Sequence, residues 1–131
     1  MSDIVLTEDA QKALIKGAFG KDGQLMPFVQ EIFLLECHVA GTMFRKLSDI
    51  ESNLEPENIL TFKRESDNKH DNLAIEIFDQ EAHSLGYVPR KNNEILARLM
   101  DAGKLIFGKI ESVEKIDHWL KIEVRIFMRD F

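Results

Sequence analysis

The sequence predicts a mainly β fold with one inserted helix, in which six antiparallel strands form a small barrel after a short N-terminal helical or irregular extension. Two observations predict this fold. Six short apolar or alternating runs are separated by turn residues, and the apolar spacing changes to a helical period once, after the fourth run. Closing the sheet removes exposed strand edges, which favours a barrel. The length suggests one domain, with 1–33 as the extension and 34–131 as the barrel.

The extension contains a candidate helix at residues 7–19. Thr7 suits the N-cap, two acids follow it in the first turn, and an apolar stripe at helical spacing is formed by Ala10, Ala13, Leu14 and Ala18. Gly20 and Gly23 end this helix. Pro27 interrupts any regular element in residues 24–32.

The six strands are expected at residues 33–39, 59–64, 73–78, 83–88, 104–113 and 118–128. Between the fourth and fifth strands, residues 90–102 have apolar side chains at helical spacing, and Gly103 stands where helices commonly end. Residues 45–58 form a long polar connection, in which a helical turn is expected at 47–54.

The last strand has the most regular alternation in the chain. Its purely apolar residues point to one side, and the other side carries Trp119, Lys121, Glu123, Arg125 and Phe127. Aromatic side chains interleaved with basic ones are typical of a surface on which bases stack. The alternative, which we favour, is that the inserted helix or the N-terminal extension covers this face.

Composition and charge limit the possible functions. A net charge of -6 argues against strong non-specific binding to duplex nucleic acid, although a local basic groove stays compatible with it because salt screens distant charges. No apolar run is long enough to span a membrane, and the N-terminus lacks the basic region of a signal peptide. The single cysteine, Cys37, lies in an apolar run where a buried, inert thiol is expected. A cytoplasmic location is the simplest interpretation.

The segment from Arg64 to Arg90 holds the main candidate site. Its loop at 66–72 combines two Asp, two Asn, a Lys and a His between two strands. Binding residues often lie in such a loop, although a solvated turn has the same composition. His70 and Asp71 are neighbours that would point to opposite sides, which disfavours an acid–base pair. The spacings of zinc and calcium ligands are missing, so no metal, cofactor or catalytic site is expected.

Two motifs in this segment resemble those of the HIRAN domain, which occurs at the N-terminus of some DNA-repair helicases and as small stand-alone bacterial proteins. The first motif is Arg64-Glu65-Ser66-Asp67-Asn68-Lys69-His70-Asp71-Asn72-Leu73-Ala74-Ile75, and the second is Gly86-Tyr87-Val88-Pro89-Arg90. The end of the predicted helix, Leu99-Met100-Asp101-Ala102-Gly103, is also similar to the family pattern. The resemblance covers most of the chain, from Leu34 to Met128.

The resemblance implies a modified OB-like barrel without enzymatic activity that binds single-stranded DNA at a free 3′ end, in DNA repair or processing. Asp71 looks like the acid that holds the terminal hydroxyl, and Asn68 looks like its polar neighbour. His70 stands where the family often has a stacking Tyr, and Phe44 falls near the other stacking aromatic. A helicase or another repair protein is the implied protein partner.

Two arginines flank the motifs. Arg64 and Arg90 are candidates for contacts with phosphates or bases, and the alternative is that they pair with local acids such as Glu65 or Glu94. Tyr87, in the second motif, is expected to pack in the core or at the rim.

The chain departs from the family pattern at several positions. Ser66 replaces the usual Pro, Leu73 replaces the usual Asn, and Met43 stands where the helicase form has an Arg. Together with the acidic balance, these changes favour a rival interpretation, a protein-interaction or mobile-element accessory module that keeps the fold without binding DNA. The sequence does not predict the oligomeric state.

Overall fold

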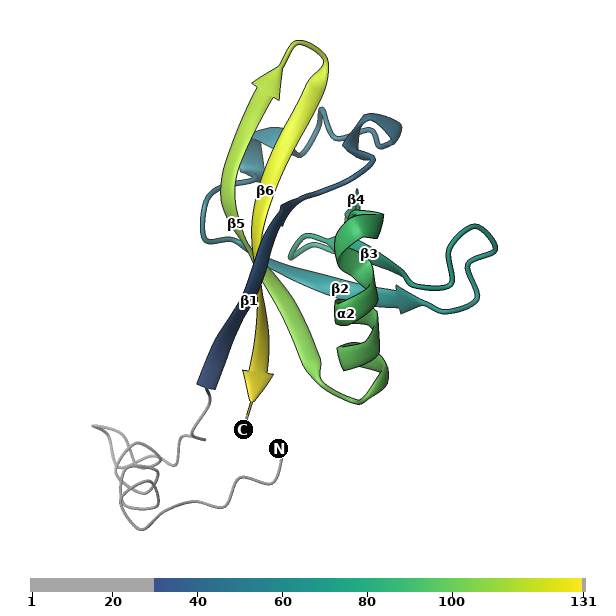
Figure 1. Cartoon of the computed structure of the whole chain (residues 1–131). Helices are drawn as coiled ribbons and strands as arrows, with labels where there is room; N and C mark the ends of the chain where they lie inside the picture. The colour runs from purple at the N-terminus through teal and green to yellow at the C-terminus, as the bar shows by residue number, and fades with distance from the viewer. Residues whose placement is uncertain (1–29, 131) are drawn as a thin grey trace, which may run out of the picture.

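The computed structural model describes residues 30–130, so the helix expected at 7–19 lies outside the described residues. The strands form one antiparallel sheet in the order β1-β6-β5-β2-β3-β4 (Figure 1). Their bounds are β1 Gln30–His38, β2 Ile59–Glu65, β3 Ala74–Phe78, β4 Ser84–Tyr87, β5 Leu105–Ile116 and β6 Trp119–Asp130. The helix α2, Arg90–Asp101, follows β4, and two short 3-10 turns, η1 (Thr42–Phe44) and η2 (Glu51–Asn53), lie between β1 and β2. The prediction of six antiparallel strands with one inserted helix is confirmed.

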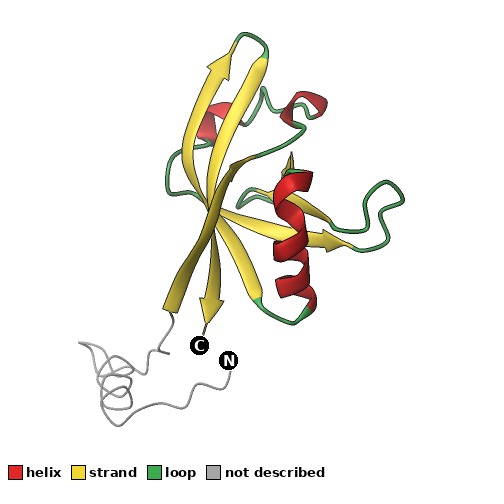
Figure 2. Cartoon of the chain, in the orientation of Figure 1, coloured by secondary structure: helices red, strands yellow, loops and turns green. Residues whose placement is uncertain are grey.

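The sheet does not close into a continuous barrel, which corrects the predicted closure. Its edge strands are connected by a single bridge, in which Ala40 and Tyr87 exchange backbone hydrogen bonds of 2.7 and 2.8 Å. Strand β4 has four residues and is too short to continue a ladder along β1. The helix α2 lies across the sheet and packs against β3 and β5 (Figure 2), with Leu96 and Ala97 fully buried.

The core lies on the inner side of the curved sheet. The alternation predicted for β6 is confirmed, because Ile122, Val124 and Ile126 are completely buried while the residues between them are partly exposed. Burial of Cys37 is also confirmed, and burial raises the pKa of its thiol to about 11, which keeps the thiol protonated at neutral pH.

On the outer side of the sheet, Phe127 packs against other aromatic residues. Its ring stacks on Phe107 at 5.6 Å between centroids and meets the edge of Phe33 at 5.8 Å. The prediction that the helix α2 covers this face is wrong, because the apolar side of α2 packs against the core on the inner side of the sheet. The N-terminal extension was the other element expected to cover this face, and its residues 1–29 lie outside the described range.

Two elements begin or end differently from the prediction. Strand β1 begins at Gln30, so residues 30–33 already pair with β6. Strands β5 and β6 extend towards each other as a long hairpin, whose final pair is Ile116 and Trp119 and whose turn contains Asp117 at φ 53°. The sequence does not indicate this extension because the residues at the end of β5 are polar and exposed. A hairpin that lies in solvent does not require alternating apolar residues.

Candidate nucleic-acid interface

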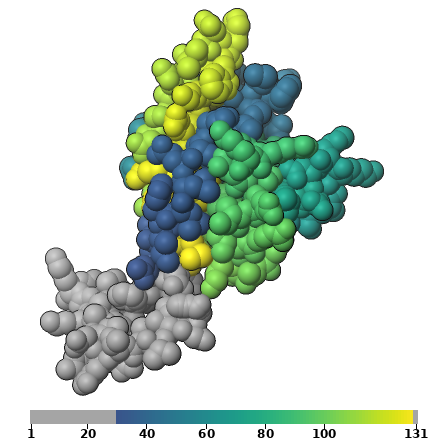
Figure 3. Space-filling model, viewed as in Figure 1, coloured from purple at the N-terminus to yellow at the C-terminus, as the bar shows by residue number. Residues whose placement is uncertain are grey.

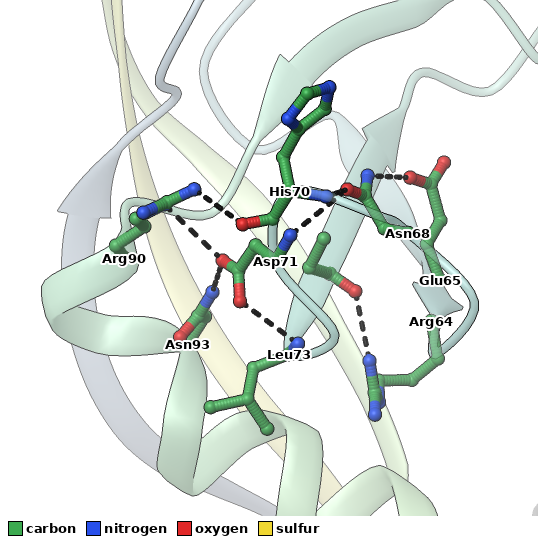
Figure 4. Close-up of polar contacts among 9 residues, drawn as sticks. Arg64, Glu65, Asn68, His70, Asp71, Leu73, Arg90 and Asn93 are labelled. Carbon is green, nitrogen blue, oxygen red and sulfur yellow. Dashed lines mark hydrogen bonds and ion pairs between the residues drawn. The ribbon is translucent and has the colours of Figure 1, made fainter.

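The loop between β2 and β3 is organised around the side chain of Asn68. Its Oδ1 accepts hydrogen bonds from the backbone N–H groups of His70 at 2.8 Å and Asp71 at 3.1 Å (Figure 4). Its Nδ2 donates to Glu65 Oε1 at 2.9 Å. Asn side chains commonly hold a turn in this way. Asn68 therefore fixes the backbone that positions its two neighbours.

Asp71 connects the loop to the following strand and to the helix. Its Oδ1 accepts from the backbone N–H of Leu73 at 3.0 Å, and its Oδ2 accepts from Asn93 Nδ2 at 2.8 Å. The Leu73 N–H is the main cause that lowers the pKa of Asp71, and the Asn93 amide acts in the same direction against partial burial. A carboxylate has about four acceptor positions, so these two bonds leave capacity for a ligand hydroxyl.

His70 and Arg90 form the exposed rim beside this carboxylate. Arg90 Nη2 donates to the backbone carbonyl of His70 at 2.9 Å, and its Nε lies 3.6 Å from Asp71 Oδ2. The Arg90 side chain is 73% exposed, which leaves much of its guanidinium open to a ligand. The His70 ring points away from the Asp71 carboxylate in Figure 4, so these neighbours lie on opposite sides as predicted, although the loop bends here rather than forming a strand.

These residues surround a surface depression of about 400 Å³. Four of the predicted site residues line it, and the complete lining is Ala40, Gly41, Asn68, His70, Asp71, Ala74, Tyr87, Val88 and Arg90. Phe44 lies beside the depression in η1, which follows Gly41, and is 78% exposed. Five of the six predicted residues are thus brought to one place.

Arg64 is the exception. Its guanidinium makes a two-pronged contact with Asp101, with distances of 2.9 and 3.0 Å, and also donates to the carbonyl of Ala74 at 3.0 Å. Its side chain is only 13% exposed and does not line the depression. Arg64 therefore ties the end of β2 to the end of α2, and its acidic partner is neither Glu65 nor Glu94.

Comparisons with known proteins agree with this architecture. The family model of the HIRAN domain matches residues 32–129. The chain belongs to the HIRAN domain family. None of the curated proteins compared with the chain matches it.

Solved structures share the HIRAN fold of this chain. A crystal structure of a protein from Lactobacillus plantarum has a TM-score of 0.73 at 22% identity, over 79% of this chain and all of that one. The HIRAN domain of human HLTF has a TM-score of 0.61 at 16% identity, over 76% of this chain and 78% of that one. An NMR structure of the same human domain in its DNA-bound conformation has a TM-score of 0.54 at 15% identity, over 76% of this chain and 79% of that one.

The HIRAN fold also brings to the depression, or close to it, residues that the sequence did not indicate as ligand contacts. Tyr87 lines it and donates its hydroxyl to Glu65 Oε1 at 2.9 Å, so its expected place at the rim is confirmed. Arg45 lies over the Tyr87 ring at 5.6 Å and bonds Ser84 and Glu76. Nothing in the sequence indicates that Asn93 contacts the site, because a polar residue in the first turn of a helix normally faces solvent.

Other features of the described residues bear on function. Within residues 30–130 no group of three or more His, Cys, Asp or Glu side chains is arranged to hold a metal ion. Over the same range no helix has the length and apolar character needed to cross a lipid bilayer.

Proposed function

We propose that this protein is a non-enzymatic module that binds single-stranded DNA and receives a free 3′ end in the depression around Asp71. Membership of the HIRAN family and the DNA-bound conformation of the human HLTF domain support a nucleic-acid ligand. A helicase or another repair protein would then be the partner that uses the captured end.

The proposal rests on three properties of the Asp71 carboxylate, which are its exposure, its remaining capacity to accept hydrogen bonds and its ionisation. It is 20% exposed, lines the depression, and keeps acceptor capacity beyond its bonds to Leu73 and Asn93. A lowered pKa keeps it ionised at neutral pH, and an ionised acceptor forms the stronger bond with a sugar hydroxyl. A terminal phosphate at the same position would be repelled, so the site favours a hydroxyl end.

The residues around Asp71 suit the rest of a terminal nucleotide. His70 and Phe44 are exposed and have flat faces on which bases can stack. Arg90 is anchored through Nη2 to the His70 carbonyl and its Nε faces Asp71, so the donors of Nη1 are available to a phosphate. Asn68 retains one amide hydrogen beyond its bond to Glu65, which can donate to the sugar.

Fluorescence anisotropy tests the proposal with short labelled strands that differ only at the 3′ end. A strand with a 3′ hydroxyl should bind, and the same strand with a 3′ phosphate should bind at least about tenfold more weakly, the cost of one charge-assisted hydrogen bond. Asp71→Asn should remove this preference, because an amide no longer repels the phosphate.

Asp67→Asn is the matched control for this experiment. Asp67 is exposed in the same loop and makes no side-chain hydrogen bond within residues 30–130, so its substitution removes one charge without removing a contact. Equal binding of both strand ends by the unmodified protein would refute end recognition.

The accessory-module alternative also has support in the structure. Arg64 is occupied by Asp101, and Met43, 65% exposed, stands in place of an arginine, so neither position supplies a free cation to the depression of a chain with net charge -6. Absence of binding to either strand at low salt would favour this alternative, because electrostatic contacts are strongest under that condition.

A further inference from the structure

A second hollow of the surface lies next to the depression. It is a groove of about 260 Å³ between the connection that follows β1 and the tip of the β5–β6 hairpin. The connection contributes residues from Thr42 to Glu51, and the hairpin contributes Lys115, His118 and Leu120. Figure 3 shows this hairpin rising beside the connection, away from α2. The two hollows share no lining residue, so a nucleotide bound in the depression as proposed would leave this groove free.

The turn η1 separates the groove from the depression. It contacts both β4 and β6, and Thr42 Oγ1 anchors it by donating to the Leu120 carbonyl at 2.7 Å. Met43 and Phe44 project from this turn and are 65% and 78% exposed. Large apolar side chains on a ridge between two hollows are costly in water, and a stacked base would cover them.

Arg45 connects the two hollows directly. It lines the groove, and its guanidinium lies 5.6 Å from the centre of the Tyr87 ring, which lines the depression. A ligand that leaves the depression across η1 therefore reaches the groove without crossing another element.

The lining of the groove contains three basic residues, Arg45, Lys46 and Lys115, and two acids, Asp49 and Glu51, in a chain of net charge -6. Arg45 is paired with Glu76, outside the lining, at 3.4 Å. Lys46 is exposed and forms no ion pair with any residue of the described range. Lys115 is 51% exposed although its Nζ lies 3.1 Å from Glu51. Lys46 and Lys115 are thus the exposed basic side chains of the groove, and they can act on a nearby phosphate because distant acids are screened.

We propose that the groove holds the backbone of a strand whose 3′ end lies in the depression. The strand crosses η1 with a base on Phe44 and Met43, and its next phosphates meet Lys46 and Lys115. The inference rests on the proposed function and adds the path of the chain beyond the end nucleotide. OB folds bind about 4 nucleotides or more, which exceeds what an end pocket alone accommodates.

The experiment compares a thymidine dinucleotide with a strand of about eight thymidines, both with 3′ hydroxyl ends, by anisotropy at several salt concentrations. Wild type should bind the longer strand more tightly. In the double variant Lys46→Ala/Lys115→Ala this gain should fall on the order of tenfold, while dinucleotide binding stays unchanged. The salt dependence for the longer strand should decrease by about 0.7 for each lysine removed.

Lys104→Ala is the control, since Lys104 lies between α2 and β5, at the end of the sheet opposite the hairpin tip (Figure 1). An equal effect of Lys104→Ala, or equal affinity of wild type for both lengths, would overturn the groove while leaving end binding intact. Absence of binding to both strands would instead overturn the proposed function together with the groove.

Discussion

The side-chain amide of Asn93 donates a hydrogen bond of 2.8 Å to the carboxylate of Asp71, and this contact joins the loop between β2 and β3 to the first turn of α2. Asn93 is 3% exposed, so no water can easily replace its amide at the carboxylate. The position of the candidate 3′-end acceptor therefore depends on the position of the helix.

Replacement of Asn93 tests this dependence. Asn93→Ala leaves Asp71 Oδ2 without its donor, and we expect the free energy of unfolding to fall by about 1–3 kcal/mol, with weaker binding of a 3′-hydroxyl strand. Asn92→Ala is the matched control, because Asn92 Oδ1 has no hydrogen-bond partner within residues 30–130. Urea unfolding and anisotropy measure the two effects, and equal losses in both variants would contradict the role of Asn93.

Gly86 allows the edges of the sheet to meet. Its φ is 145°, and a Cβ at this position would overlap the carbonyl oxygen of Ala40 and lie 2.9 Å from Val39 Cγ1. We expect Gly86→Ala to break the bridge between Ala40 and Tyr87 and to lower the free energy of unfolding by about 3 kcal/mol or more.

Gly103→Ala provides the comparison for this substitution. Gly103 has a φ of 89°, but a Cβ added to it would meet no atom within 4 Å, so only backbone strain of about 1 kcal/mol is expected. Similar midpoints of urea unfolding for the two variants would show that the close approach of Gly86 to Ala40 does not contribute to stability.

Arg64 and Asp101 should behave as one structural unit. We expect Arg64→Ala to lower stability more than Asp101→Ala, because it also removes the bond to the Ala74 carbonyl. The double variant should lose less than the sum, because both changes remove the same ion pair. Their effects on strand binding should match. A selective loss of binding in Arg64→Ala would instead support the phosphate contact that the sequence suggested for this residue.

The sequence predicts the strands well where one face is buried. In β6 the residues that alternate from Leu120 to Ile126 are the buried ones. Of the apolar residues at helical spacing in 90–102, Leu96 is fully buried, Leu99 and Met100 are partly buried, and Ile95 is 59% exposed. The closure of the sheet was not predictable in the same way. It depends on the length of β4 and on one bridge at Ala40, and neither leaves a periodic pattern in the sequence.

The candidate site was predicted through its motif rather than through its contacts. The loop residues Asn68, His70 and Asp71 lie together because they are close in sequence. Partners from distant elements, such as Asn93 at Asp71 and Arg45 at Tyr87, were missed because tertiary packing alone brings them there. The same packing directs Arg64 towards an acid at the end of α2, 37 positions away, which no local pattern in the sequence indicates.

The acid stability of the protein should depend on carboxylates that are bonded in the folded state. The bond from Leu73 lowers the pKa of Asp71, and the bond from Arg64 lowers the pKa of Asp101. The unfolded chain binds protons at higher pH than the folded one, so this stability is complete above the unfolded pKa of about 4 and is lost as the pH falls through the folded values. Asp71→Asn should therefore show a weaker fall in urea midpoint below about pH 4. Parallel curves for wild type and variant would contradict the assignment.

Phe44 and Phe33 are both exposed phenylalanines, but only Phe44 lies beside the depression. If a base of the bound strand stacks on Phe44, Phe44→Ala should weaken binding by about 1–3 kcal/mol, the usual contribution of base stacking on an aromatic ring. Phe33→Ala removes another exposed phenylalanine from the outer side of β1, where its ring meets Phe127, and should leave binding unchanged. Titration of both variants with the same 3′-hydroxyl strand separates stacking at the site from a general loss of surface hydrophobicity. Equal losses in the two variants would contradict stacking that is specific to Phe44.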